Sequence, residues 1–169
     1  MVEPIKNTAR IFAIDTRFQK MAKRPGGVPR DVAVKRAEKF IDELKPEFVI
    51  WLDTELQELS AAVRGAEGSS FDPSWHKRAY RTSSRLRDVG GTMGYEMISF
   101  IAGNFCEVLD VIDRGIAYDR DVMNCHLDSL FLVKTEPYRN LTPEQLPEMT
   151  NGLRRVVEFA NSAADRTVK

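Results

Sequence analysis

The sequence predicts an all-α fold, an antiparallel helical bundle, on three observations. Apolar residues recur every three or four positions in several separate segments, which is the period of an amphipathic helix. Short stretches rich in glycine, proline and serine separate these segments and indicate turns. No segment shows the alternation of apolar and polar residues that is typical of a half-buried strand. Amphipathic helices joined by short loops bury their apolar faces by packing antiparallel to one another.

The chain is expected to divide into an arm and a helical domain. Residues 1–30 are predicted to form an extended N-terminal arm because no helical period runs through them, and residues 31–169 are predicted to form the bundle domain. Helix-breaking residues interrupt the arm at Pro25, Gly26, Gly27 and Pro29. Four apolar residues of the arm can still anchor it on the bundle surface: Ile11, Phe12, Ile14 and Phe18.

The first two helices of the domain are expected to meet at a proline. Asp31 can cap a helix that reaches about Leu44, and Pro46 then breaks or kinks it because proline lacks a backbone donor. A second helix is expected from Pro46 to about Arg64. Its apolar stripe contains Phe48, Leu52, Leu56, Leu59 and Val63. Phe48 and the neighbouring Trp51 are predicted to be core residues.

The third helix is unusually basic. Asp72 followed by Pro73 predicts an N-cap with proline at the first helical position, and the helix is expected to reach about Val89. It carries six basic side chains: His76, Lys77, Arg78, Arg81, Arg85 and Arg87. A corner of small residues follows at Gly90, Gly91 and Gly94.

Three more helices complete the predicted bundle. The first has an apolar stripe over residues 97–112, in which Phe105 and Leu109 are predicted to be buried. The second runs from about Asp119 to Thr135. The last has the clearest start signal, because Thr142-Pro143-Glu144-Gln145 forms a capping box with proline at its first position.

Composition argues against several classes of function. Among the 169 residues, 25 are Lys or Arg and 25 are Asp or Glu, so the formal net charge is zero. A nucleic-acid-binding domain usually has a basic excess, so no nucleic-acid partner is expected. No apolar run suits a signal peptide or a membrane span, so a cytoplasmic protein without a membrane partner is expected.

Neither the cysteines nor the histidines predict a metal or redox site. Cys106 and Cys125 lack the close spacing of such sites, and both are expected to be reduced, buried thiols. His76 and His126 lie on different predicted helices. No phosphate-binding loop or metalloprotease motif occurs, so no metal and no cofactor is expected.

The segment from Ala79 to Asp110 carries a more specific signal. Its corner, Gly90-Gly91-Thr92-Met93-Gly94-Tyr95, resembles the Gly-Gly-Thr-Phe-Gly-Tyr corner of histidine phosphotransfer (HPt) domains of the alphaproteobacterial type, without gaps. In this register residues 80–81 match the family's Phe-Arg, and residues 105–109 match a later helix with Leu-Cys-x-Leu-Leu. Residues 37–59 and 125–130 look like its flanking helices. The resemblance implies an HPt-like four-helix core with additional flanking helices and a role in bacterial two-component phosphorelay signalling.

The chain departs from the family at the phosphoacceptor. In HPt domains an exposed histidine takes the phosphoryl group, a lysine three residues later offsets its charge, and a glycine four residues later allows close approach. Here Ser84 stands at the histidine position, Arg87 at the lysine position and Asp88 at the glycine position. A serine alkoxide is strongly basic, and no histidine lies within one turn to activate it. His76 lies about 80° round the helix and about 12 Å away, so it is expected to face elsewhere.

The resemblance therefore implies a pseudo-phosphotransfer protein, not an enzyme, which binds a response-regulator receiver domain or a sensor histidine kinase without carrying phosphate. The predicted docking face is formed by Arg81, Ser84, Arg85, Arg87, Asp88 and Gly91. Ser84 and Arg87 are expected to be exposed. Two alternatives stay open: an active phosphotransfer protein that uses His76 or His126, and a ligand-binding bundle unrelated to signalling, which a deep apolar pocket would favour. The simplest structural explanation of the basic face is a solvated arginine-rich helix.

Overall fold

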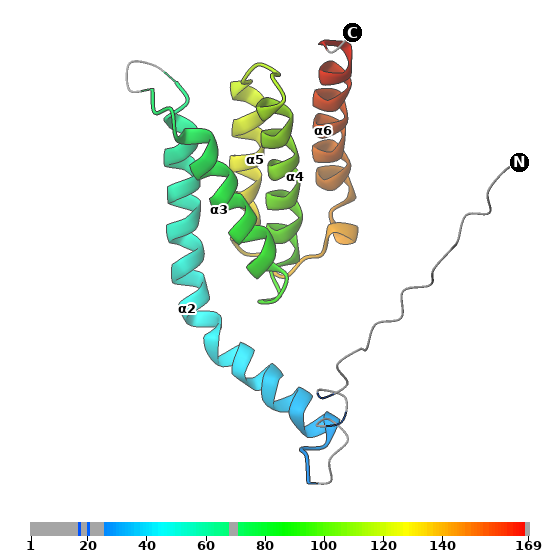
Figure 1. The fold of residues 1–169 in the computed structure, drawn as a ribbon. Coiled ribbons are helices and arrows are strands. Elements are labelled where there is room, and N and C mark those ends of the chain that lie inside the picture. The colour runs from blue at the N-terminus through cyan, green and yellow to red at the C-terminus, as the bar shows by residue number, and fades with distance from the viewer. Residues whose placement is uncertain (1–16, 18–19, 21–25, 68–70, 168–169) are drawn as a thin grey trace, which may run out of the picture. The chain divides into compact units, whose positions relative to one another are not determined.

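The structure of the protein, a computed structural model, describes residues 17, 20, 26–67 and 71–167. Its chain divides into two units, residues 1–40 and 41–169, and each is described by itself. The described α-helices are α2 (Arg30–Arg64), α3 (Trp75–Gly90), α4 (Glu96–Asp113), α5 (Arg120–Val133) and α6 (Pro147–Thr167). A short 3₁₀ helix, η2 (Pro143–Gln145), precedes α6. The described residues contain no strand, so the predicted all-α class is confirmed (Figure 1).

Most of the predicted arm lies outside the described residues, including all four of its apolar anchors. Arg17 and Lys20 have helical backbone conformations, and residues 26–29 belong to no helix. Helix α2 then begins at Arg30, so Asp31 lies in the first helical turn rather than at the cap. An offset of one residue is within the ordinary variation of helix ends.

Helix α2 continues through Pro46, where the sequence predicted two segments. Proline removes one backbone donor from a helix but has a φ angle that helices tolerate. Beyond the proline, Leu52, Leu56 and Leu59 are almost wholly buried. Burying a leucine side chain contributes about 1.5–3 kcal/mol, so this stripe stabilises the part of α2 that follows the proline.

Within residues 41–169 the helices form a bundle. His76 of α3 contacts Leu109 of α4, whereas Arg87 of α3 contacts Ser99 of α4, so these two helices run antiparallel. Helix α5 returns antiparallel to α4, and α6 then runs in the same direction as α4 (Figure 1). The predicted bundle is therefore confirmed, with the Ser84 helix packed beside the helix of residues 97–112 as expected.

Two predicted helix starts differ in detail. Asp72 accepts hydrogen bonds from the backbone N–H of Ser74 at 2.8 Å and from its hydroxyl at 2.7 Å. This turn delays α3 until Trp75, because an aspartate that bonds the backbone two residues later forms a turn of its own. The capping box at Thr142 is present, but it starts the 3₁₀ helix η2. Helix α6 starts separately at Pro147, a residue suited to a first helical position.

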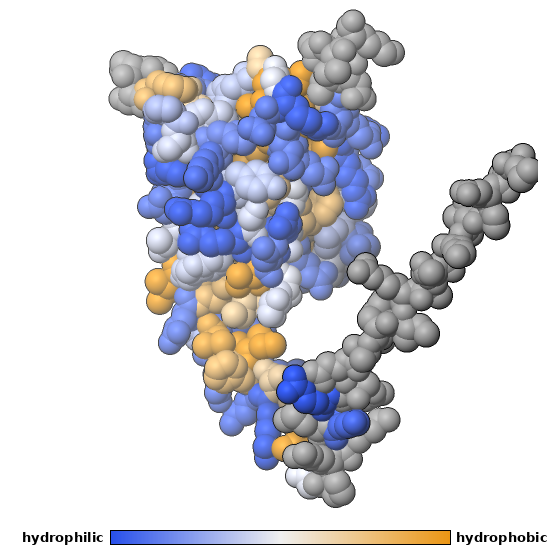
Figure 2. All heavy atoms as spheres, viewed as in Figure 1, coloured by the Kyte–Doolittle hydropathy of each residue, from blue (hydrophilic) through white to orange (hydrophobic). Residues whose placement is uncertain are grey.

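The core is filled by apolar side chains from α2 to α6, and three of the four predicted core residues are buried: Phe48, Phe105 and Leu109. Trp51 is only half-buried and packs at the core's edge, with its ring centroid 5.4 Å from that of Phe48. Where α3 and α4 face away from the core, hydrophilic side chains cover most of their surface in the view of Figure 2. No helix among the described residues is long and apolar enough to cross a membrane.

The two cysteines are free thiols in different environments. Cys106 is buried, as predicted, but Cys125 is exposed, so the prediction of two buried thiols was wrong for Cys125. The reason is the rotation of α5, which turns the next residue, His126, fully into the core. Its ring stacks on that of Phe105, with centroids 5.2 Å apart and planes at 16°.

Candidate functional site

An open groove of about 710 Å³ runs along α3 and the C-terminal half of α4. Its lining residues come from these two helices alone: His76, Lys77, Tyr80, Arg81, Ser84, Arg85, Asp88, Asp110 and Asp113. Lys77, Arg81, Ser84 and Asp88 lie four, three and four residues apart, so helical geometry places them in one row. This row is about 16 Å long at 1.5 Å per residue. Four of the six residues predicted to form the docking face therefore line one groove: Arg81, Ser84, Arg85 and Asp88.

Ser84 is partly exposed at the centre of this row. Its Oγ lies 3.7 Å from Sγ of Cys106 on α4, which is a weak hydrogen bond in which either atom can donate. Burial raises the pKa of the Cys106 thiol, so this sulfur stays protonated and cannot accept the serine proton as a base. The Ser84 hydroxyl is accessible from the groove, but no side chain that bonds it can activate it.

Arg87 and Asp88 neutralise each other. Nε of Arg87 donates to Oδ1 of Asp88 at 2.9 Å. Arg87 is exposed, as predicted, but it does not line the groove, and its side chain lies beside Gly103 of α4. In the alignment with HPt domains, Arg87 takes the place of the lysine near the phosphoacceptor. In the structure its charge is directed to the carboxylate of Asp88 instead of to Ser84.

Arg85 is also engaged, by a residue that the sequence reasoning missed. Its guanidinium lies 2.6 Å from Oε2 of Glu55 on α2. Glu55 is 5% exposed, and burial raises its pKa while Arg85 lowers it. A signal for this contact was present in the sequence, because Glu55 lies three residues after Leu52 and four before Leu59, on the buried stripe.

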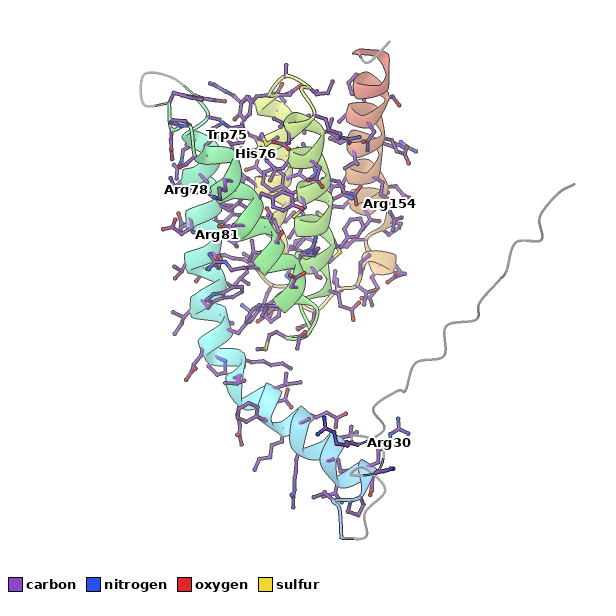
Figure 3. The ribbon with its side chains drawn as sticks, in the orientation of Figure 1. Arg30, Trp75, His76, Arg78, Arg81 and Arg154 are labelled. Atoms are coloured by element: carbon purple, nitrogen blue, oxygen red, sulfur yellow. The ribbon has the colours of Figure 1, made fainter. Side chains whose placement is uncertain are left out.

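Arg81 differs from these two arginines. It is exposed, lines the groove and forms no ion pair with any residue that the structure describes. Lys77, one turn earlier, likewise has no ion pair there. Figure 3 shows His76, Arg78 and Arg81 extending from α3; Arg78 is bound by Asp72 at 2.8 Å. Of the three arginines of the predicted docking face, Arg81 alone forms no ion pair in the described part of the chain, although its charge also acts to lower the pKa of Glu55.

His76 lies in the same groove as Ser84, so the prediction that it faces elsewhere was wrong. The groove is wide enough to take in two neighbouring rows of α3, and His76 and Tyr80 form the second row. Nε2 of His76 lies 2.8 Å from the carbonyl oxygen of Leu109. A carbonyl only accepts, so Nε2 carries a proton, and in the neutral ring Nδ1 has the free lone pair. Nδ1 has no hydrogen-bond partner among the described residues.

His126 is fully buried in the core, unlike His76, which lines the open groove. Its Nδ1 lies 2.8 Å from the carbonyl oxygen of Val122, so Nδ1 donates. Nε2 is buried and has no hydrogen-bond partner in the described part of the chain. Burial lowers the pKa of this histidine, which keeps the ring neutral. A fully buried imidazole cannot meet a second protein, so His126 is no candidate phosphoacceptor in this conformation.

The glycine corner is required by contacts within the bundle. A Cβ at Gly90 would lie 3.1 Å from the backbone nitrogen of Ser99 and 3.2 Å from the carbonyl oxygen of Tyr95. Gly94 has a φ of +83°, which disfavours any residue with a side chain. Gly91 is exposed, does not line the groove and has room for a Cβ. The close contact of α3 with the start of α4 thus explains Gly90 without a partner.

No three metal-ligating side chains of the described residues lie together in a metal-binding arrangement. Comparison with protein-family models, with curated proteins and with solved structures gave no match to this chain. The resemblance to HPt domains therefore depends on the residues of the α3–α4 segment themselves.

Proposed function

We propose that this protein is an HPt-like signalling protein that docks a receiver domain or a sensor histidine kinase of a two-component phosphorelay without carrying the phosphoryl group. The observation that carries the proposal is the position of Ser84, which is partly exposed and lines the α3–α4 groove. An antiparallel α3–α4 pair joined by a tight glycine corner is compatible with the family's arrangement.

The surroundings of Ser84 support docking without transfer. The side-chain hydrogen-bond partner of its hydroxyl is the sulfur of a protonated thiol, and a serine needs a base to become a nucleophile. Asp88, one turn later, is held by Arg87, which reduces the repulsion that a free carboxylate would exert on an acidic partner. The first feature disfavours phosphorylation at this position, and the second leaves the face compatible with a receiver.

Arg81 is the residue best placed to attract such a partner. Its charge is exposed and unpaired among the described residues, whereas Arg85 and Arg87 are each bound by a carboxylate. Charges on a docking surface mainly increase the association rate and make binding sensitive to salt. The docking proposal therefore depends on Arg81 more than on the two neighbouring arginines.

A second candidate function is favoured by one observation, the free Nδ1 lone pair of His76 in the same groove. In this alternative Nδ1 attacks the phosphorus of an aspartyl phosphate, a P–N bond forms, and the P–O bond to the carboxylate breaks. The hydrogen bond from Nε2 to Leu109 would stabilise the positive charge that develops on the ring.

The remaining alternative, a ligand-binding bundle, would require a deep apolar pocket. The mainly apolar pocket described between α4, α5 and α6 has a volume of about 90 Å³. Such a pocket does not favour a bundle that encloses a ligand.

The deciding experiment incubates the full chain with receiver domains charged with labelled phosphate, and measures both binding and acid-labile label on the chain. We expect binding to at least one receiver or kinase without label, and we expect label on the double variant Ser84→His/Asp88→Gly. Label on the wild-type chain that His76→Gln abolishes would establish the second candidate instead. Absence of binding to every receiver and kinase of the source organism would overturn the docking proposal.

A further inference from the structure

The α3–α4 groove has unpaired charges of opposite sign on its two walls. Lys77 and Arg81 are the cations of the α3 wall, and Asp110 and Asp113 are the carboxylates of the α4 wall. All four residues are exposed, and none forms an ion pair with another residue in the described part of the chain. Opposite charges that line one groove without pairing leave both walls available to a ligand with complementary groups.

The other charged groups of the groove are already compensated. Glu55 holds Arg85 at 2.6 Å, and Arg87 holds Asp88 at 2.9 Å. The open charges are thus confined to the end of the groove near the start of α3 and the end of α4. Asp110 and Asp113 lie three residues apart in the last turn of α4, so both face the same side of the helix.

An aromatic side chain of α3 also lines this groove. Tyr80 lines the groove, is half-buried and packs against the hydrophobic core. It lies three residues after Lys77 and directly before Arg81, so its ring and the two cations come from one turn of α3. A ring held by the core offers a planar apolar surface on which another planar ring can stack.

These three features together select a class of ligand. Cations bind a phosphate, an aromatic ring stacks on a base, and carboxylates accept hydrogen bonds from adjacent N–H groups. We infer that the groove binds a guanine nucleotide, with its phosphate at Lys77 and Arg81, its base on Tyr80 and its N1–H and N2–H₂ edge at Asp110 or Asp113. An adenine presents one amino group beside a ring nitrogen that only accepts, so it matches a carboxylate less well. This inference does not depend on receiver docking or on phosphotransfer.

Titration calorimetry on the full chain tests the inference, with GMP, AMP and inorganic phosphate as probes. We expect GMP to bind at least ten-fold more tightly than AMP, and inorganic phosphate to bind more weakly than either nucleotide. Equal affinity for GMP and AMP, equal affinity for GMP and inorganic phosphate, or no binding of GMP at millimolar concentration would each overturn it.

Two sets of variants separate recognition of the base from recognition of the phosphate. Asp110→Asn/Asp113→Asn should weaken GMP binding to the level of AMP and leave AMP binding within two-fold of wild type. Arg81→Gln should weaken both nucleotides about equally. Glu107→Gln/Asp128→Asn removes the same two charges from exposed positions outside the groove and should change neither affinity. An equal loss of GMP binding in this control and in the aspartate pair would also overturn the inference.

Discussion

The carboxylate of Glu55 and the guanidinium of Arg85 form an ion pair at 2.6 Å that joins α2 to α3. The two partners are unequally buried, since the Glu55 side chain is 6% exposed and that of Arg85 is 47% exposed. Removing the arginine leaves a buried carboxylate without its cation, whereas removing both charges leaves no such penalty. Arg85 therefore stabilises the fold in addition to lining the groove.

Arg85→Ala is expected to lower the free energy of unfolding by about 1–3 kcal/mol, and Glu55→Gln/Arg85→Ala should recover part of that loss.

Burial already raises the pKa of Glu55 in the folded state, and loss of Arg85 should raise it further. A raised carboxyl pKa means that the folded state binds the proton more readily, so stability is lost as pH rises through that pKa. The defect of Arg85→Ala should consequently shrink as the pH is lowered toward the ordinary carboxyl range. Urea unfolding at several pH values measures this, and a defect that does not change with pH would contradict the assignment.

His126 should make the protein less stable in mild acid. Its folded-state pKa is depressed below the ordinary value of 6.5, chiefly by burial. The unfolded state thus takes up the proton first, so this contribution to stability is complete above about pH 6.5 and is lost as the pH falls toward the depressed pKa. His126→Gln should be less stable at neutral pH but should show a flatter pH dependence below 6.5. Thermal unfolding between pH 7.5 and pH 5 measures the slope, and identical slopes in the two proteins would count against the prediction.

Phe105 is fully buried in the core and stacks on His126, so Phe105→Ala should cost about 3–5 kcal/mol of stability. Phe159 is the matched control, because its side chain is 71% exposed. Phe159→Ala should change the stability by no more than about 0.5 kcal/mol. Denaturant unfolding of both variants checks the pair, and a cost below about 1 kcal/mol for Phe105→Ala, well under the range for buried aromatics, would refute its place in the core.

Gly90 and Gly91 are adjacent but should respond oppositely to alanine. At Gly90 the new Cβ would meet backbone atoms of Ser99 and Tyr95 at 3.1 and 3.2 Å, so Gly90→Ala should cost about 1–3 kcal/mol. Gly91 has right-handed helical angles, and its nearest contact for a Cβ lies at 3.5 Å. Gly91→Ala should therefore leave stability unchanged or raise it by about 0.4–1 kcal/mol, since alanine restricts the unfolded chain. If denaturant unfolding shows equal losses of stability in the two variants, a constraint other than the contact of the new Cβ must act at the corner.

Arg81 should control association with the docking partner. Arg81→Glu is expected to slow binding to a receiver or kinase, and more so at low salt, because exposed charges act over about 10 Å at 0.1 M ionic strength. Arg155→Glu, an exposed position on α6 away from the groove, makes the same change of charge and should leave the rate within about two-fold. Stopped-flow or surface-binding kinetics at two salt concentrations distinguish them. A loss that is the same at both concentrations would mean that Arg81 acts through packing rather than through charge.

The sequence by itself determined the class of fold and most of its elements. Apolar residues at helical spacing predicted the helices and placed Phe48, Phe105 and Leu109 in the core. The cap at Asp119 was also predictable, because its side chain accepts hydrogen bonds from the N–H groups of Asp121 and Val122, which lie only two and three residues away. These features are local, so the chain order alone fixes which groups can meet.

Only the tertiary structure decided which groove side chains remain available. The periodicity of the sequence predicts that Glu55, Arg85, Arg87 and Asp88 lie on helices. It does not predict how far apart those helices pack or how each helix is rotated about its axis. The separation of α2 and α3 brings Glu55 to Arg85, and it leaves Arg81 without such a carboxylate. The rotation of α5 buries His126 and exposes Cys125. The distances between helices determine which partners a long side chain can reach. These distances result from packing of the whole core rather than from any one segment.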